Sequence, residues 1–91
     1  MYINSISDFR RAMRNGPYAW PGGYPCYFIT DDGAALSFET AKTERRQIIE
    51  SIVHKLRDGW RVVAMDINYE DPELYCDHTG KRIESAYAEP E

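Results

Sequence analysis

Cysteine is scarce in this chain of 91 residues, which has only Cys26 and Cys76 and no C-x-x-C pair. Two thiols are too few for a disulfide framework, so we expect both to be reduced. No apolar run approaches the roughly 18 residues that a membrane span needs, and the N-terminal residues lack the apolar core of a secretory signal. These absences predict a cytoplasmic protein without a membrane segment.

Positive charge is scarce in the last third of the chain. Residues 1–62 hold nine Lys or Arg and seven Asp or Glu, whereas residues 63–91 hold two and eight, a balance of −6. A protein that coats nucleic acid needs a basic face, so this asymmetry makes direct nucleic-acid binding less favoured. An acidic third favours a basic partner instead.

Catalytic and metal-binding motifs are also absent. The chain has no G-x-S-x-G, no phosphate-binding glycine loop and no H-E-x-x-H. Cys76-x-His78 offers two metal-capable side chains, but zinc needs four ligands and the chain has one further cysteine and one further histidine. We therefore predict no enzyme, no metal and no cofactor. The alternative that stays open is a small metal-dependent enzyme built on His78 with Asp77 and Glu84.

The strongest strand signal is W-R-V-V-A-M-D-I-N-Y, residues 60–69, which is rich in β-branched and aromatic residues and free of Gly and Pro. Its middle is apolar on both faces of the pleat, which predicts a central strand. Beyond the middle, Asp66, Asn68 and Glu70 share one face. We expect them to form a polar row, mostly of carboxylates, at the surface.

Two hairpins are predicted around this strand. Residues 26–30 and 34–38 are apolar runs joined by Asp31-Asp32-Gly33, and Asp-Gly between such runs is typical of a tight hairpin turn. Residues 74–76 and 82–87 would form the second hairpin.

Two helices are predicted. Ser7 would cap a short helix over residues 8–14 that stops at Gly16. Thr40 would cap a long helix that ends at Gly59 and carries an apolar stripe of isoleucine, valine and leucine at helical spacing.

The length and these elements together predict a single domain over residues 1–91. Hairpins favour an antiparallel arrangement. The expected fold class is therefore α+β: an antiparallel sheet of about four to five strands, with one long helix packed on one face and a short N-terminal helix.

The candidate binding residues lie in two groups. Residues 16–25, G-P-Y-A-W-P-G-G-Y-P, place Tyr18, Trp20 and Tyr24 among prolines and glycines, where they could cover the end of a small core or form a rigid contact surface. Both roles can coexist. The second group consists of the polar residues of the acidic third: Asp66, Asn68, Glu70, Asp71, Glu73 and Asp77.

A basic group supports the main alternative function. Two clusters of basic side chains on the predicted helices could contact phosphates together. They are Arg10, Arg11 and Arg14, and Lys42, Arg45 and Arg46. This arrangement would suit a nucleic-acid-binding accessory protein, although solvated helix faces are the simpler interpretation and the acidic third would repel a duplex.

Three stretches carry a resemblance to known proteins. They are Y-F-I-T-D-D-G-A-A-L-S-F, G-W-R-V-V-A-M-D-I-N-Y-E-D-P and L-Y-C-D-H-T-G-K-R-I-E-S-A-Y. They resemble small uncharacterised proteins of bacterial plasmids, integrative elements and phages, over residues 17–87.

The resemblance brings no catalytic residues and no transferable site. Small acidic products of such elements often include anti-CRISPR and anti-restriction inhibitors, which bind host defence complexes. The resemblance therefore implies a non-enzymatic protein-binding module that inhibits a host nucleic-acid-handling complex. Its partner would be a host protein or nucleoprotein complex, and a homodimer is compatible with the sequence.

Overall fold

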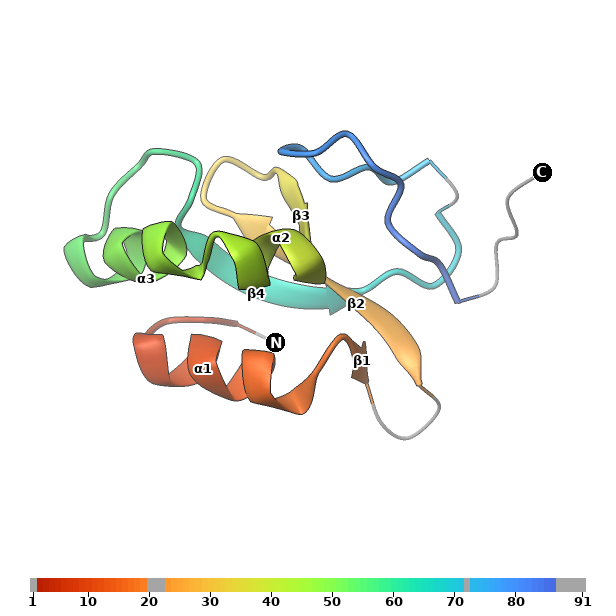
Figure 1. The fold of residues 1–91 in the computed structure, drawn as a ribbon, viewed down its shortest axis with the longest axis horizontal. Coiled ribbons are helices and arrows are strands. Elements are labelled where there is room, and N and C mark those ends of the chain that lie inside the picture. The colour runs from red at the N-terminus through yellow and green to blue at the C-terminus, as the bar shows by residue number, and fades with distance from the viewer. Residues whose placement is uncertain (1, 20–22, 72, 87–91) are drawn as a thin grey trace.

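The structure is a computed structural model that describes residues 2–19, 23–71 and 73–86. Over these residues the fold is α+β, with three helices and a four-stranded antiparallel sheet (Figure 1). The elements in chain order are α1 (Ile6–Asn15), β1 (Tyr18–Ala19), β2 (Tyr24–Thr30), β3 (Ala35–Ser37), α2 (Phe38–Thr43), α3 (Arg45–His54) and β4 (Val62–Ile67).

Strand β2 is the centre of the sheet, because it pairs antiparallel with β1, β3 and β4. Phe28 of β2 lies opposite Leu36 of β3 and Met65 of β4. The hairpin predicted for residues 26–38 is therefore confirmed as β2 and β3. The central position predicted for residues 60–69 is wrong: on its far side β4 meets only the N-terminal segment, through an isolated bridge between Tyr2 and Ala64.

The core lies between the sheet and the helices and is built around Phe28, which is fully buried. The ring of Phe9 in α1 lies 5.7 Å from that of Phe28, and the ring of Phe38 at the start of α2 lies 5.9 Å from it. Ile48 brings α3 into the same cluster. Helices α1 and α2 thus both contact the same aromatic side chain of the sheet, Phe28.

The predicted single long helix is wrong, since two helices occupy its place. Ser37 caps α2 by accepting a hydrogen bond from the Thr40 backbone N–H at 3.1 Å, so Thr40 lies inside the helix and is not its cap. Glu44 separates α2 from α3 with φ −102° and ψ 22°. Helix α3 ends at His54, where Lys55 is the C-cap residue with a left-handed φ of 51°, and not at Gly59. Apolar periodicity continues across Glu44 and therefore could not reveal the break.

Helix α1 begins earlier than predicted. Its N-cap is Ser5, whose Oγ accepts a hydrogen bond from the Asp8 N–H at 3.2 Å, and not Ser7, which lies within the helix. Ile6 packs against the core, so the helix has to include it. None of the helices in the described parts of the chain has the length and apolar character needed to cross a membrane.

The segment after β4 returns beside β3 and forms an irregular layer, drawn in blue above the sheet in Figure 1. The Asp77 N–H donates to the Ala35 carbonyl at 2.8 Å, which attaches the segment to β3. The predicted second hairpin is reduced to an isolated bridge between Tyr75 and Arg82, and Tyr87 lies outside the described residues.

Candidate functional site

Three tyrosines lie at the end of the sheet where β4 finishes, but Tyr18 is paired with Pro25 and so projects from the opposite face of the sheet to Tyr24. Tyr18 and Tyr24 lie on the adjacent strands β1 and β2, and the rings of Tyr24 and Tyr69 lie 5.5 Å apart. The Tyr18 hydroxyl donates a 2.8 Å hydrogen bond to the Glu84 carboxylate. Trp20 lies outside the described residues. The structure thus joins Tyr24 to Tyr69, which the sequence did not single out, and Tyr18 to Glu84, which the sequence named only beside His78 and Asp77.

Two carboxylates lie near a fourth tyrosine, Tyr27 of β2. Asp66 lies opposite Tyr27 in the pairing of β2 with β4. Burial raises the pKa of the Tyr27 hydroxyl, and the charges of Asp66 and Asp71 raise it further. Because both charges act on one side chain, they lie near the same part of the sheet. We call this region the tyrosine–acid surface; it comprises Tyr18, Tyr24, Tyr69, Asp66, Glu70, Asp71 and Glu84.

Asn68 is buried under this surface and does not join the predicted polar row, since its side chain is 3% exposed. Its amide nitrogen donates to the backbone carbonyls of Asp71, Ile83 and Glu84, at 3.0, 3.4 and 3.1 Å. Its carbonyl oxygen accepts the Asp71 N–H at 3.2 Å. Asn68 therefore holds the turn after β4 against the returning segment, which fixes the backbone that carries Glu70 and Glu84.

The two remaining predicted carboxylates lie at different places. The Glu73 N–H donates to the Asp71 carboxylate at 2.9 Å, so Glu73 adjoins the tyrosine–acid surface. Asp77 lies at the edge of β3 and lines a separate small cavity together with Trp60 and His78. The acidic third of the sequence therefore does not form one continuous patch.

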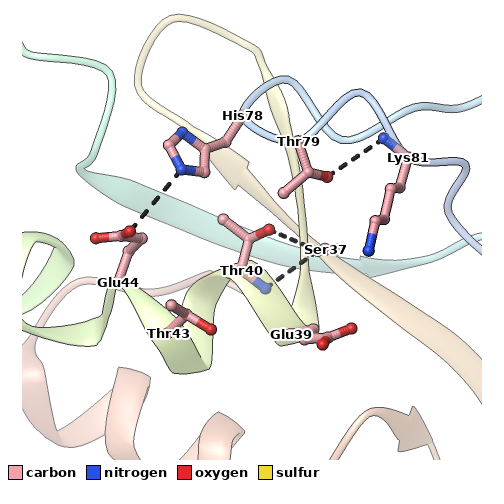
Figure 2. A pocket seen from close by; sticks show the side chains of 8 residues that line it. All are labelled: Ser37, Glu39, Thr40, Thr43, Glu44, His78, Thr79 and Lys81. Carbon is pink, nitrogen blue, oxygen red and sulfur yellow. Dashed lines mark hydrogen bonds and ion pairs between the residues drawn. The ribbon is translucent and has the colours of Figure 1, made fainter.

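A second polar region lies over helix α2 (Figure 2). It is a pocket of about 160 Å³. His78 Nε2 lies 3.8 Å from Glu44 Oε1, and the His78 ring meets the edge of the Trp60 ring at a centroid distance of 5.0 Å. The lining residues are Ser37, Glu39, Thr40, Thr43, Glu44, His78, Thr79 and Lys81.

The sulfur of Cys76 lies against two residues of this pocket, and Cys76 as a whole is 1% exposed. Burial opposes ionisation of the thiol, but hydrogen bonds from the Ser37 backbone N–H, the Thr40 hydroxyl and Thr79 outweigh it and lower the pKa to about 6. The Ser37 N–H lies 3.4 Å and the Thr40 hydroxyl 3.3 Å from the sulfur. Two of these donors, Ser37 and Thr40, lie more than thirty residues earlier in the chain, so the sequence around Cys76 gives no sign of them.

Metal binding finds no support in the geometry of Cys76 and His78. Cys76 is buried, whereas the His78 side chain is 45% exposed and faces Glu44. Within the described ranges, no three residues of the kinds His, Cys, Asp and Glu lie together as a set of metal ligands.

The basic side chains that the sequence singled out on the helices are exposed, and no ion pair joins any of them to another residue of the described ranges. The six are Arg10, Arg11 and Arg14 of α1, Lys42 of α2, and Arg45 and Arg46 of α3.

No family model, curated protein or solved structure matches this chain.

Proposed function

We propose that this chain is a non-enzymatic protein-binding module whose tyrosine–acid surface contacts a basic surface of a host protein or nucleoprotein complex. The observation that carries the proposal is that one end of the sheet holds the Tyr24–Tyr69 ring contact, the Tyr18–Glu84 hydrogen bond and the pairing of Asp66 with Tyr27. Tyrosine gives large contact area at a low cost in side-chain entropy, and binding energy concentrates on such residues. Carboxylates around them speed the encounter with a cationic partner.

The surface is both accessible and held in place. Tyr18 and Tyr69 are 42% and 49% exposed, so each has area to bury on binding. Contact between the rings of Tyr24 and Tyr69 and the hydrogen bonds of Asn68 hold the surrounding backbone. A surface that is ordered before binding loses less entropy when its partner arrives.

The partner class follows from the charge. Proteins that handle nucleic acid present Lys and Arg to phosphates, and the carboxylates of Asp66, Glu70 and Asp71 would take the place of those phosphates. A module of this kind acts as an inhibitor, since it occupies the surface that nucleic acid needs. The resemblance to products of plasmids, integrative elements and phages suits an inhibitor of the anti-CRISPR or anti-restriction kind.

An affinity pull-down from bacterial lysate, run with and without nuclease, tests the proposal. We expect a stoichiometric protein partner that survives nuclease treatment. The double variant Asp66→Asn/Glu70→Gln should then weaken binding about fivefold, since each exposed charge contributes a modest attraction. Tyr69→Ala should weaken it about tenfold.

The matched control is Glu44→Gln/Glu50→Gln, which removes the same charge at the N-cap of α3 and within α3, away from the tyrosine–acid surface. It should bind like the original chain. Equal losses of affinity in the two double variants would show that only net charge matters. Unchanged affinity in Asp66→Asn/Glu70→Gln would contradict the phosphate-mimicry part of the proposal.

The unpaired arginines of α1 favour a second candidate, a nucleic-acid-binding accessory protein. Recovery of partners only while nucleic acid is intact would support it. Retention on DNA should then fall steeply with salt and disappear in Arg10→Gln/Arg11→Gln/Arg14→Gln.

A further inference from the structure

A cleft of about 200 Å³ opens beside the tyrosine–acid surface, between strands β1 and β3. The Cys26 N–H of β2 donates to the Pro17 carbonyl next to β1, and the Thr30 N–H of β2 donates to the Ala34 carbonyl next to β3. Alternate residues of a strand direct their backbone groups to the same edge, so β1 and β3 border one edge of β2. The cleft lies along this edge, where the two strands separate.

Three parts of the chain form the walls of the cleft. Tyr18 lies in β1, Phe38 begins α2, and residues 82–84 belong to the segment that returns after β4. Tyr18 is 42% exposed and Phe38 is half-buried, so both rings offer surface, whereas the buried Cys26 closes the bottom. The volume is below the roughly 300–1,000 Å³ of pockets that take small organic molecules. The cleft therefore suits a single side chain.

Two carboxylates of the lining are exposed, Glu39 in the first turn of α2 and Glu84 in the returning segment. Neither belongs to an ion pair within the described ranges, and Figure 2 shows the Glu39 carboxylate pointing away from His78 and Glu44. The hydrogen bond from the Tyr18 hydroxyl to Glu84, together with the charge of Glu84, raises the pKa of Tyr18. Tyr18 thus remains a neutral donor that fixes the position of the Glu84 carboxylate.

Arg82 is the one cation of this lining, and it does not neutralise the two carboxylates. Its Nη2 atom donates to Ser85 Oγ at 3.3 Å, and Ser85 is buried and lies outside the lining. Within the described residues no ion pair joins Arg82 to Glu39 or Glu84. Two carboxylates against one guanidinium leave the cleft with an excess of negative charge beside aromatic walls.

We infer that this cleft receives an arginine side chain of the partner protein, with the guanidinium at Glu84 and Glu39 and the hydrocarbon stem against the rings of Tyr18 and Phe38. A guanidinium is planar, so it can form two parallel hydrogen bonds with a carboxylate and stack on an aromatic ring; the ammonium of lysine is a point charge. Arginine is also one of the residues in which interface binding energy concentrates. The inference rests on the proposed function, because it names the chemistry by which the basic partner engages one side of the tyrosine–acid surface.

Titration of the full chain with N-acetylarginine amide, followed by backbone amide NMR shifts, tests the inference. We expect a dissociation constant on the order of 10 mM, since one side chain supplies a small part of an interface, and shifts at Tyr18, residues 37–39 and residues 82–84. The citrulline analogue has the same shape without the charge and should bind at least about fivefold more weakly. The lysine analogue has the charge without the planar fork and should bind about threefold more weakly.

Three variants locate the guanidinium. Glu39→Gln changes an exposed residue of the cleft that is not part of the tyrosine–acid surface, and it should weaken both the arginine probe and the partner about threefold. Glu84→Gln keeps an acceptor for the Tyr18 hydroxyl and should weaken both about fivefold. Glu50→Gln, within α3 and outside the lining, is the matched control and should bind normally.

The inference is overturned by equal affinity for the arginine and citrulline probes, by shifts outside the cleft, or by unchanged affinity of the partner for Glu39→Gln. Equal affinity for the lysine probe would overturn the choice of arginine. The proposed function survives these results if Asp66→Asn/Glu70→Gln still weakens the partner. A pull-down without any partner removes the proposed function instead, while the probe titration still measures whether the cleft prefers a guanidinium.

Discussion

The thiol of Cys76 should make the stability of this protein depend on pH in a way that one substitution removes. Cys76 is 1% exposed, and the Ser37 N–H and the Thr40 hydroxyl lie 3.4 and 3.3 Å from its sulfur. The Ser37 hydroxyl donates to the Thr40 hydroxyl oxygen at 2.9 Å, which leaves the Thr40 hydrogen free for the sulfur. Such donors favour the charged thiolate.

The sign of the effect follows from the direction of the shift. The pKa of Cys76 falls from 9.0 to about 6 in the folded protein, so between these values the unfolded chain binds a proton that the folded chain has lost. The free energy of unfolding should therefore rise with pH across this window, by up to about 1.4 kcal/mol per pH unit. Between pH 6.5 and 8.5 the ceiling is about 2.7 kcal/mol, and the contribution is lost as the pH falls through 6.

Urea denaturation at several pH values, with the original chain and Cys76→Ser compared, measures this contribution. Serine has no titration in the window, so the difference between the two chains isolates Cys76 from the histidines. Cys26→Ser is the control, because burial raises the pKa of Cys26. The free energy of unfolding of this variant should still rise with pH across the window. If the free energy of unfolding changed with pH in parallel for the original chain and Cys76→Ser, Cys76 would not be a thiolate in the folded protein.

Two further predictions concern stability and are measured by the same denaturation. Phe28→Ala should lower the free energy of unfolding by about 3–5 kcal/mol, because Phe28 is fully buried and contacts the rings of Phe9 and Phe38. A loss under about 1 kcal/mol would mean that α1 and α2 do not both pack on Phe28. Asn68→Ala should cost about 2–4 kcal/mol, because three backbone carbonyls lose their donor. Asn68→Asp should be at least as damaging, since a carboxylate cannot donate to them, and a stable Asn68→Asp protein would argue against the observed orientation of the amide.

Local features of the fold could be predicted from the sequence. Asp31-Asp32-Gly33 between two apolar runs marked the turn between β2 and β3, because turn chemistry depends on adjacent residues. The start of α1 was placed two residues late, as two serines offer the same capping group and only the core contact of Ile6 distinguishes them.

Features that depend on distant partners could not be predicted. The parity of β4 placed Asn68 at the surface, yet backbone carbonyls 15 and 16 residues later hold it inside. The contact between Tyr24 and Tyr69 likewise joins segments that only the folded sheet brings together. For the candidate site, the sequence therefore indicated the residue types but not which of them meet.

The central place of β2 has a consequence during synthesis. Phe28 meets Leu36 as soon as the first hairpin closes, but its partner on the other side, Met65, emerges only after α2 and α3. Until then one long edge of β2 carries backbone groups with no strand beside them, and such an edge invites pairing with other chains. A nascent chain that stalls before Val62 would therefore be the form of this protein most prone to aggregate.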